Sequence, residues 1–224
     1  MPRRIALVHA LAVSIEPVQA AFRRLWPDAW CSNLLDDALG PDRARDVELT
    51  DAIRARIGAL ADYAASTGAD GVLFTCSAFG DAIEQAAARL PLPVLKPNEA
   101  MFEAALAAGD RVGMLATFAP AVAGMEEEFR ALARQRGRPA ATIETICVAD
   151  AMAALQTGDA ETHNRLLAEA APRLRNHDAI LLAQFSTARA EQAVEAALGR
   201  SVHTSPGSAV AKLKGILDSN SSDN

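Results

Sequence analysis

Cys76 is the residue of this 224-residue chain whose setting points most directly to catalysis. It follows the apolar run Gly71–Phe74 and precedes a helical pattern, so its thiol should lie at a strand-to-helix turn. The free amides and the dipole of a helix N-terminus favour a thiolate, which predicts a lowered thiol pKa. The neighbours Thr75 and Ser77 offer hydroxyl donors. The alternative is a small buried hydrophobe, as most free cysteines are.

Polar residues follow two other apolar runs. His9 ends the first run and could accept the thiol proton or stabilise the thiolate as an imidazolium, or it could be a satisfied polar residue at a strand end. Asn33 lies near the end of the second run, and Asp36 comes just after it. They could orient a base or bind a substrate, although aspartates in loops more often cap turns. We take His9 as a candidate catalytic residue, and Asn33 and Asp36 as candidate binding residues.

Thr117 ends a further apolar run, and Phe118 follows it at the start of a helical pattern. Backbone amides at such a turn, together with the Thr117 hydroxyl, would hold a carboxylate or a phosphate. Thr is also an ordinary helix-capping residue. Two further cysteines, Cys31 and Cys147, lie inside apolar runs and are interpreted as structural.

Short apolar runs alternate with longer helical patterns along the whole chain. The predicted strands are Ile5–His9, Ala29–Leu34, Gly71–Phe74, Val94–Leu95, Val112–Leu115, Thr142–Cys147, Ala179–Ala183 and Val202–Thr204. The predicted helices are Pro17–Leu25, Val47–Ser66, Ala78–Arg89, Glu99–Ala108, Pro120–Arg136, Ala160–Leu174, Thr187–Leu198 and Ser208–Leu217. Such alternation predicts an α/β fold with parallel sheets flanked by helices.

The two halves of the sequence resemble each other. Asp70 and Asp178 open matching apolar runs 108 residues apart, and Ile5 and Val112 open another matching pair 107 apart. A duplication predicts two pseudo-symmetric lobes, residues 1–98 with 207–224 and residues 99–206, each with a four-stranded parallel sheet. Ligands of open parallel sheets bind beyond the carboxyl ends of the strands, here in a cleft between the lobes. The residues expected there are His9, Thr75, Cys76, Ser77, Ala78, Thr117, Gln184, Phe185, Ser186, Thr204, Ser205 and Pro206.

Composition narrows the possible partners. A net charge of −6 and a pI near 5.3 argue against nucleic acid and anionic membranes as partners. No run is long enough to span a membrane or form a signal peptide, and three cysteines without Cys-x-x-Cys spacing suit a reducing cytoplasm. The histidines show no metal-ligand spacing, so no dedicated metal site is expected. The sequence is compatible with a homo-oligomer but does not determine the oligomeric state.

The segments Thr75–Ser77, Leu115–Thr117 and Asp178–Gln184 resemble the aspartate/glutamate racemase superfamily, which includes hydantoin and allantoin racemases, maleate cis-trans isomerases and arylmalonate decarboxylase. The resemblance implies two lobes, no cofactor and one catalytic cysteine from each lobe. Cys76 matches the first cysteine. Gln184 stands at the position of the second, and an amide cannot act as an acid or a base.

The sequence therefore predicts a cofactor-independent isomerase that acts on a small organic acid through Cys76 alone, as an acid/base or as a nucleophile. Thr75, Ser77, Thr117 and Gln184 would hold the carboxylate or a developing oxyanion. One alternative is a lyase of the arylmalonate decarboxylase type, whose single cysteine stands in the other lobe. Another alternative is a binding protein that has lost its chemistry.

Overall fold

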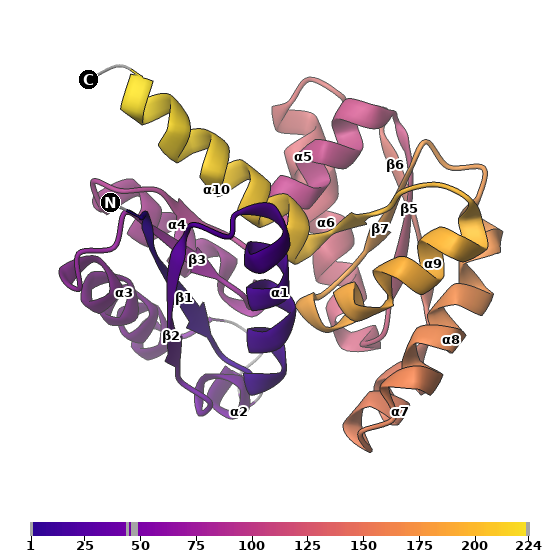
Figure 1. The fold of residues 1–224 in the computed structure, drawn as a ribbon, viewed down its shortest axis with the longest axis horizontal. Coiled ribbons are helices and arrows are strands. Elements are labelled where there is room, and N and C mark those ends of the chain that lie inside the picture. Colours follow the sequence, from indigo (N-terminus) through magenta and orange to yellow (C-terminus); the bar gives the residue numbers. More distant parts are fainter. Residues whose placement is uncertain (1, 44, 46–48, 223–224) are drawn as a thin grey trace. The chain divides into compact units, whose positions relative to one another are not determined.

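The computed structural model describes residues 2–43, 45 and 49–222 of the chain. Contacts between residues divide the chain into two units, Met1–Pro97 with Ala209–Asn224, and Asn98–Ser208. Each unit is built on one four-stranded parallel sheet with helices beside it (Figure 1).

The first sheet has the strand order β2-β1-β3-β4. Its strands are β1 (Arg4–His9), β2 (Trp30–Leu35), β3 (Gly71–Phe74) and β4 (Val94–Leu95). All pairings are parallel, and β1 lies in the centre, paired with β2 on one side and β3 on the other. The carboxyl ends of β1 and β3 are therefore neighbours, which sets His9 close to the residues that follow Phe74.

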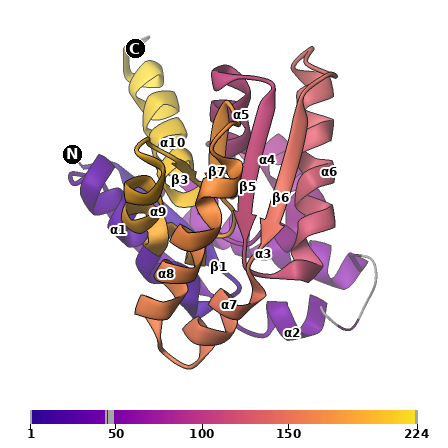
Figure 2. The ribbon, with the colours of Figure 1, turned by 90° about the vertical axis from the view of Figure 1, so that its right-hand side faces the viewer.

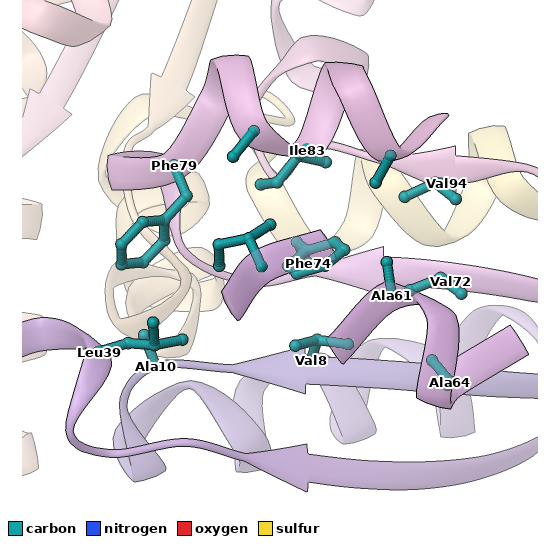
Figure 3. Packing of buried hydrophobic residues seen from close by; sticks show 14 of the residues in the cluster. Val8, Ala10, Leu39, Ala61, Ala64, Val72, Phe74, Phe79, Ile83 and Val94 are labelled. Atoms are coloured by element: carbon teal, nitrogen blue, oxygen red, sulfur yellow. The ribbon is translucent and has the colours of Figure 1, made fainter. Parts of the chain in front are cut away.

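Helices cover this sheet. They are α1 (Ile15–Leu25), α2 (Leu39–Arg43), α3 (Asp51–Ser66), α4 (Gly80–Arg89) and α10 (Ser205–Ser222), with short 3-10 turns η1 (Ala12–Ser14) and η2 (Ser77–Phe79). Side chains of α3 and α4, such as Ala61 and Ile83, pack on Val8, Val72 and Phe74 of one sheet face (Figure 3). This apolar layer fixes the strand-to-helix turn that carries Cys76.

The second sheet repeats the first, with the order β6-β5-β7-β8. Its strands are β5 (Arg111–Ala116), β6 (Thr142–Cys147), β7 (Ala179–Leu182) and β8 (His203–Thr204). The pairings are again all parallel. Together the two sheets confirm the predicted fold class of two α/β repeats, each on a parallel four-stranded sheet.

Helices pack on both faces of the second sheet, as Figure 2 shows for α6 on one side and α8 and α9 on the other. The helices are α5 (Glu99–Ala108), α6 (Ala119–Gln135), α7 (Ala149–Gln156), α8 (Ala160–Ala170) and α9 (Glu191–Leu198), with 3-10 segments η3 (Ala171–Leu174) and η4 (Phe185–Ala190). Successive strand residues point to opposite faces, so Leu181 packs with α5 and α6 while Leu182 packs with α8 and α9. Both faces are apolar, which explains the continuous hydrophobic runs of these strands.

The repeat extends to matching hydrogen bonds. Asp70 accepts from the backbone amide of Arg4 at 2.7 Å, and Asp178 accepts from the amide of Arg111 at 2.9 Å. In return, the amides of Asp70 and Asp178 donate to the carbonyls of Arg4 and Arg111, each at 2.7 Å. In both units one aspartate thus fixes the register between the central strand and its neighbour.

Several boundaries differ from the sequence-based expectation. The helices α2 and α7 were not predicted, since α2 contains Gly and Pro and the Ala-rich α7 shows no clear apolar period. Helix α3 begins at Asp51 after a Thr50 cap, while residues 47 and 48 of the predicted helix lie outside the described residues. Helix α10 continues to Ser222, beyond the predicted end at Leu217. None of the described helices is both long and apolar enough to cross a membrane.

We expect Gly109→Ala to destabilise the protein. A Cβ at Gly109 would lie 2.3 Å from the Cβ of Asp178, an atom that cannot move without the β7 strand. Forcing such overlap costs about 1–3 kcal/mol. In Gly124→Ala, the matched control within α6, the new Cβ meets nothing within 4 Å, and the change should add up to about 1 kcal/mol of stability. Denaturant unfolding of both variants measures the difference, and equal stabilities would contradict the close approach at Gly109.

Candidate active site

Cys76 lies at the turn between β3 and η2, as the sequence predicts for the position, but its pKa differs from the prediction. It is the N-cap residue of η2, with extended backbone angles of φ −123° and ψ 125°. Burial raises the pKa of the Cys76 thiol, and a hydrogen bond from the Ala78 amide lowers it by less. The thiol is therefore protonated at neutral pH.

The reason lies in the length of the helix that follows Cys76. The segment η2 is a 3-10 turn of three residues, and α4 begins only at Gly80. A single short turn has few aligned peptide dipoles, whereas the Cys76 side chain packs on the apolar cluster of the first unit. Desolvation of a thiolate in that setting outweighs one amide hydrogen bond.

His9 is fully buried at the carboxyl end of β1 and links two polar neighbours. Its Nδ1 lies 2.9 Å from the Thr75 Oγ1, and its Nε2 lies 3.0 Å from the Asn33 Oδ1. An amide oxygen can only accept, so Nε2 carries the proton and the Thr75 hydroxyl donates to Nδ1. Both ring nitrogens are engaged, and among the described residues no hydrogen bond joins His9 to Cys76. His9 thus orients Thr75 and Asn33.

The other predicted residues of the first unit lie in different settings. Asp36 is ion-paired with Arg56, which also bonds Asp42 at 2.7 Å. Ser77 and Ala78 are exposed, and the Ala78 carbonyl accepts from the Arg43 Nε at 3.4 Å. The sequence reasoning overlooked both arginines. Arg56 lies on the predicted helix Val47–Ser66, and its ion pair with Asp36 joins residues 20 positions apart in the chain.

The strand ends of the second unit bring Thr117 and Gln184 together. The Thr117 amide donates to the Gln184 Oε1 at 3.2 Å, and the Thr117 hydroxyl donates to the same oxygen at 3.0 Å. Thr117 is buried, whereas Gln184 is half-buried. With its oxygen held as a double acceptor, the Gln184 amide group keeps its NH2 as a donor for another group.

Gln184 also has an unusual backbone. Its φ of 72° with a ψ of 147° is a backbone conformation that residues other than Gly rarely adopt. Among the described residues, Gln184 is the one non-glycine residue with a positive φ. Such a conformation costs about 1–3 kcal/mol and tends to occur at functional positions. Thr187 secures the turn, because its hydroxyl donates to the carbonyls of Ala183 and, at 2.8 Å, of Gln184. Sequence reasoning missed Thr187.

The remaining predicted residues of this unit divide by burial. Phe118 is 50% exposed, while Phe185 and Ser186 are buried. Cys147, interpreted from sequence as a structural residue, is exposed at the end of β6. Cys31 is half-buried, and burial raises its thiol pKa to about 11.

We expect the protein to lose stability as the pH falls below neutrality. Burial lowers the pKa of His9 and of His163 from the ordinary value of 6.5. From about pH 6.5 down to the lower folded pKa, the unfolded chain binds a proton that the folded chain does not, which costs up to about 1.4 kcal/mol per pH unit for each ring. Urea unfolding between pH 8 and 4.5 measures the slope, which should be smaller in His9→Gln. A slope that is unchanged in this variant would contradict the assignment.

Within the described residues, no three His, Cys, Asp or Glu side chains gather closely enough to hold a metal ion. The two strand edges instead offer a protonated thiol, hydroxyls and an amide. These groups can donate a proton and bind a carboxylate or an oxyanion.

Comparison with solved structures finds racemases of the same fold. A glutamate racemase isoform from Bacillus anthracis matches with a TM-score of 0.72 and 14% identity, covering 97% of this chain and 82% of that one. Allantoin racemase from Klebsiella pneumoniae matches at 0.71 and 18%, covering 97% and 89%. A cysteine-substituted arylmalonate decarboxylase matches at 0.65 and 20%, covering 96% and 93%. At these identities the likeness is one of fold.

Sequence comparison identifies the family. No curated protein matches the chain significantly. The family model described as Asp/Glu/Hydantoin racemase, however, matches residues 15–213, which is most of the 224 residues. The predicted superfamily, and with it an enzyme of the isomerase type, is confirmed. This chain belongs to the Asp/Glu/Hydantoin racemase family.

Proposed function

We propose that this chain is a cofactor-independent isomerase that acts on a small carboxylic acid, with Cys76 as its one proton-transferring cysteine. The observation that carries the proposal is the half-buried Cys76 thiol, packed on the apolar cluster at the carboxyl end of β3, while Gln184 instead of a second cysteine stands at the matching position of the repeat. We further propose that the strand edges of both units act on the same substrate molecule, as the resemblance to two-lobed racemases implies.

A raised thiol pKa favours proton donation over nucleophilic attack. A thiolate is the nucleophilic form of cysteine, and burial makes this form scarce at neutral pH. The thiol can instead deliver its proton to a carbanion or enediolate beside the substrate carboxylate, becoming a thiolate as the new C–H bond forms. In isomerisation, the small fraction of Cys76 in the thiolate form takes the α-proton and becomes the thiol. This thiol returns a proton to the same carbon once the planar enediolate presents its other face, so no group is consumed.

The neutral donors near each strand end suit the negative charge of such a reaction. Thr75 is held by His9 at 2.9 Å, and the Gln184 amide is held by Thr117 at 3.0 Å. Donors that are fixed before the reaction stabilise a developing oxyanion without reorganising. In this proposal the free NH2 of Gln184 donates to the carboxylate and its enediolate, Thr117 keeps that amide in place, and His9 and Asn33 hold Thr75 next to Cys76.

A second candidate is a lyase that releases CO2 from a malonate-type substrate. The observation in its favour is Gln184, which has no acid/base capacity at the position where a two-cysteine racemase needs its second thiol. Loss of CO2 creates the carbanion without a base, and the protonated Cys76 then supplies the single proton that the product gains.

The two candidates are separated by incubating the purified chain in D2O with aspartate, glutamate, allantoin, a hydantoin and an arylmalonate. Deuterium entering the α-carbon while the carboxyl group is kept supports the isomerase, and CO2 release supports the lyase. Proton magnetic resonance and CO2 detection follow both products. With a substrate that loses CO2, the rate should stay level through neutral pH and fall only above the ordinary thiol pKa of 9.0, because the thiol is the proton donor. With a substrate that exchanges its α-proton, the rate should rise toward pH 9, because the thiolate must first take that proton. A decarboxylation rate that rises toward pH 9 would contradict the thiol as the donor.

A further inference from the structure

Arg189 is a half-buried cation without an anionic partner. It lies in η4, five residues after Gln184, and its Nε is fully buried with no hydrogen-bond acceptor. Within the described part of the chain its guanidinium has neither an ion pair nor a hydrogen bond. Buried donors in folded proteins are nearly always satisfied, so this one calls for an acceptor that the chain itself does not supply.

His163 provides a second buried polar atom without a partner. It is fully buried on α8, its Nδ1 lies 2.9 Å from the Asn164 Oδ1, and its Nε2 has no hydrogen-bond partner. Helix α8 packs against η4, the segment that carries Arg189. Burial, and after it the charge of Arg189, lower the pKa of His163, so the two side chains are electrostatic neighbours.

Arg189 differs in this respect from the other described arginines of the second unit. Arg165 pairs with Glu169, Arg111 pairs with Asp178, and Arg200 donates to backbone carbonyls. Others also form ion pairs: Arg130, Arg134, Arg136 and Arg138. Arg173 and Arg175 are exposed, so water can satisfy them. A half-buried arginine that lacks a counter-ion is the exception, and it follows the strand end proposed to bind substrate.

We propose that Arg189 and His163 bind a carboxylate group of the substrate, an inference that rests on the proposed function. The Arg189 Nε–H donates to one carboxylate oxygen, and the His163 Nε2–H donates to the other. The imidazole can carry its proton on Nε2 because the Asn164 amide can turn either its oxygen or its NH2 toward Nδ1. Arg189 and His163 would thus bind a substrate carboxylate that does not react, while Gln184 binds the carboxylate that becomes the enediolate.

Binding of acetate to the full chain tests this site without any turnover. In a nitrogen-15 magnetic resonance titration, the side-chain signals of Arg189 and His163 should shift and saturate together. Arg189→Gln should weaken acetate binding at least about tenfold, the usual effect of losing a charge-assisted hydrogen bond. Arg189→Lys, which keeps the charge but lacks the Nε–H donor, should also weaken it. Arg175→Gln, the control at an exposed arginine, should bind acetate as the unmodified chain does.

Thermal melting of each variant tests whether the chain still folds. If Arg189→Gln does not fold, Arg189→Lys provides the comparison. Equal acetate affinity in the unmodified chain and in Arg189→Gln would overturn the proposal, as would side-chain signals that ignore acetate. Cys76→Ser separates the two proposals. It should keep acetate binding, so turnover surviving in that variant would sink the proposed function alone.

Discussion

Replacing Cys76 by Ser should lower turnover by about a thousandfold, since a positioned acid or base contributes about 10²–10⁴ in rate. A serine hydroxyl has nearly the same shape as the thiol but is a much weaker proton donor to carbon. The fold should persist, because Cys76 is half-buried at the rim of the apolar cluster. The measurement is kcat on whichever acid exchanges its α-proton or loses CO2, with the free energy of unfolding measured alongside.

The two other cysteines are matched controls for this change. Cys31 lies in β2 and Cys147 at the end of β6, and neither belongs to the proposed site. Cys31→Ser and Cys147→Ser should each keep turnover within about twofold of the unmodified chain, as changes outside an active site usually do. If Cys76→Ser kept full turnover, Cys76 would have no chemical role. If Cys147→Ser abolished turnover, the exposed thiol at β6 would be the reactive one.

Replacing Gln184 by Ala should lower kcat/KM by about a hundredfold, close to the effect of removing one oxyanion donor. The change deletes the amide that Thr117 holds through two hydrogen bonds, so both the donor and its support are lost. Most of the loss should fall on kcat, since the interaction is expected to strengthen in the transition state. Steady-state kinetics on the responsive substrate measure this division.

Gln184→Gly serves as the control that separates strain from chemistry. Both variants lose the amide, but only Gly adopts a φ of 72° at no cost, so Gln184→Gly should be about 1–3 kcal/mol more stable than Gln184→Ala. In an ordinary strand or helix the order would be reversed. Equal activity in Gln184→Ala and the unmodified chain would remove Gln184 from the site, and a less stable Gly variant would contradict the strain.

Much of this molecule could be predicted from its sequence. The eight strands were predicted within one residue at each end, because short apolar runs between turn signals have few other ways to bury their side chains. The repeat of Asp70 at Asp178 predicted two similar halves, and the strand orders confirm the repetition. The family also followed from sequence, and the family model that matches residues 15–213 confirms it.

The electrostatic state of the site was decided by tertiary structure alone. The sequence placed Cys76 before a helix and predicted a lowered thiol pKa, but the adjoining turn is short and the apolar packing raises it. Likewise, hydrogen bonds join His9 to Asn33 and Gln184 to Thr117, which are far apart in the chain. The lack of a partner for the Arg189 Nε also depends on which distant segments surround it. The local pattern of apolar and turn-forming residues determines where a strand ends, because backbone conformation depends mainly on neighbouring residues. Desolvation and hydrogen-bond partners depend on which distant segments pack together, and only the folded chain determines that.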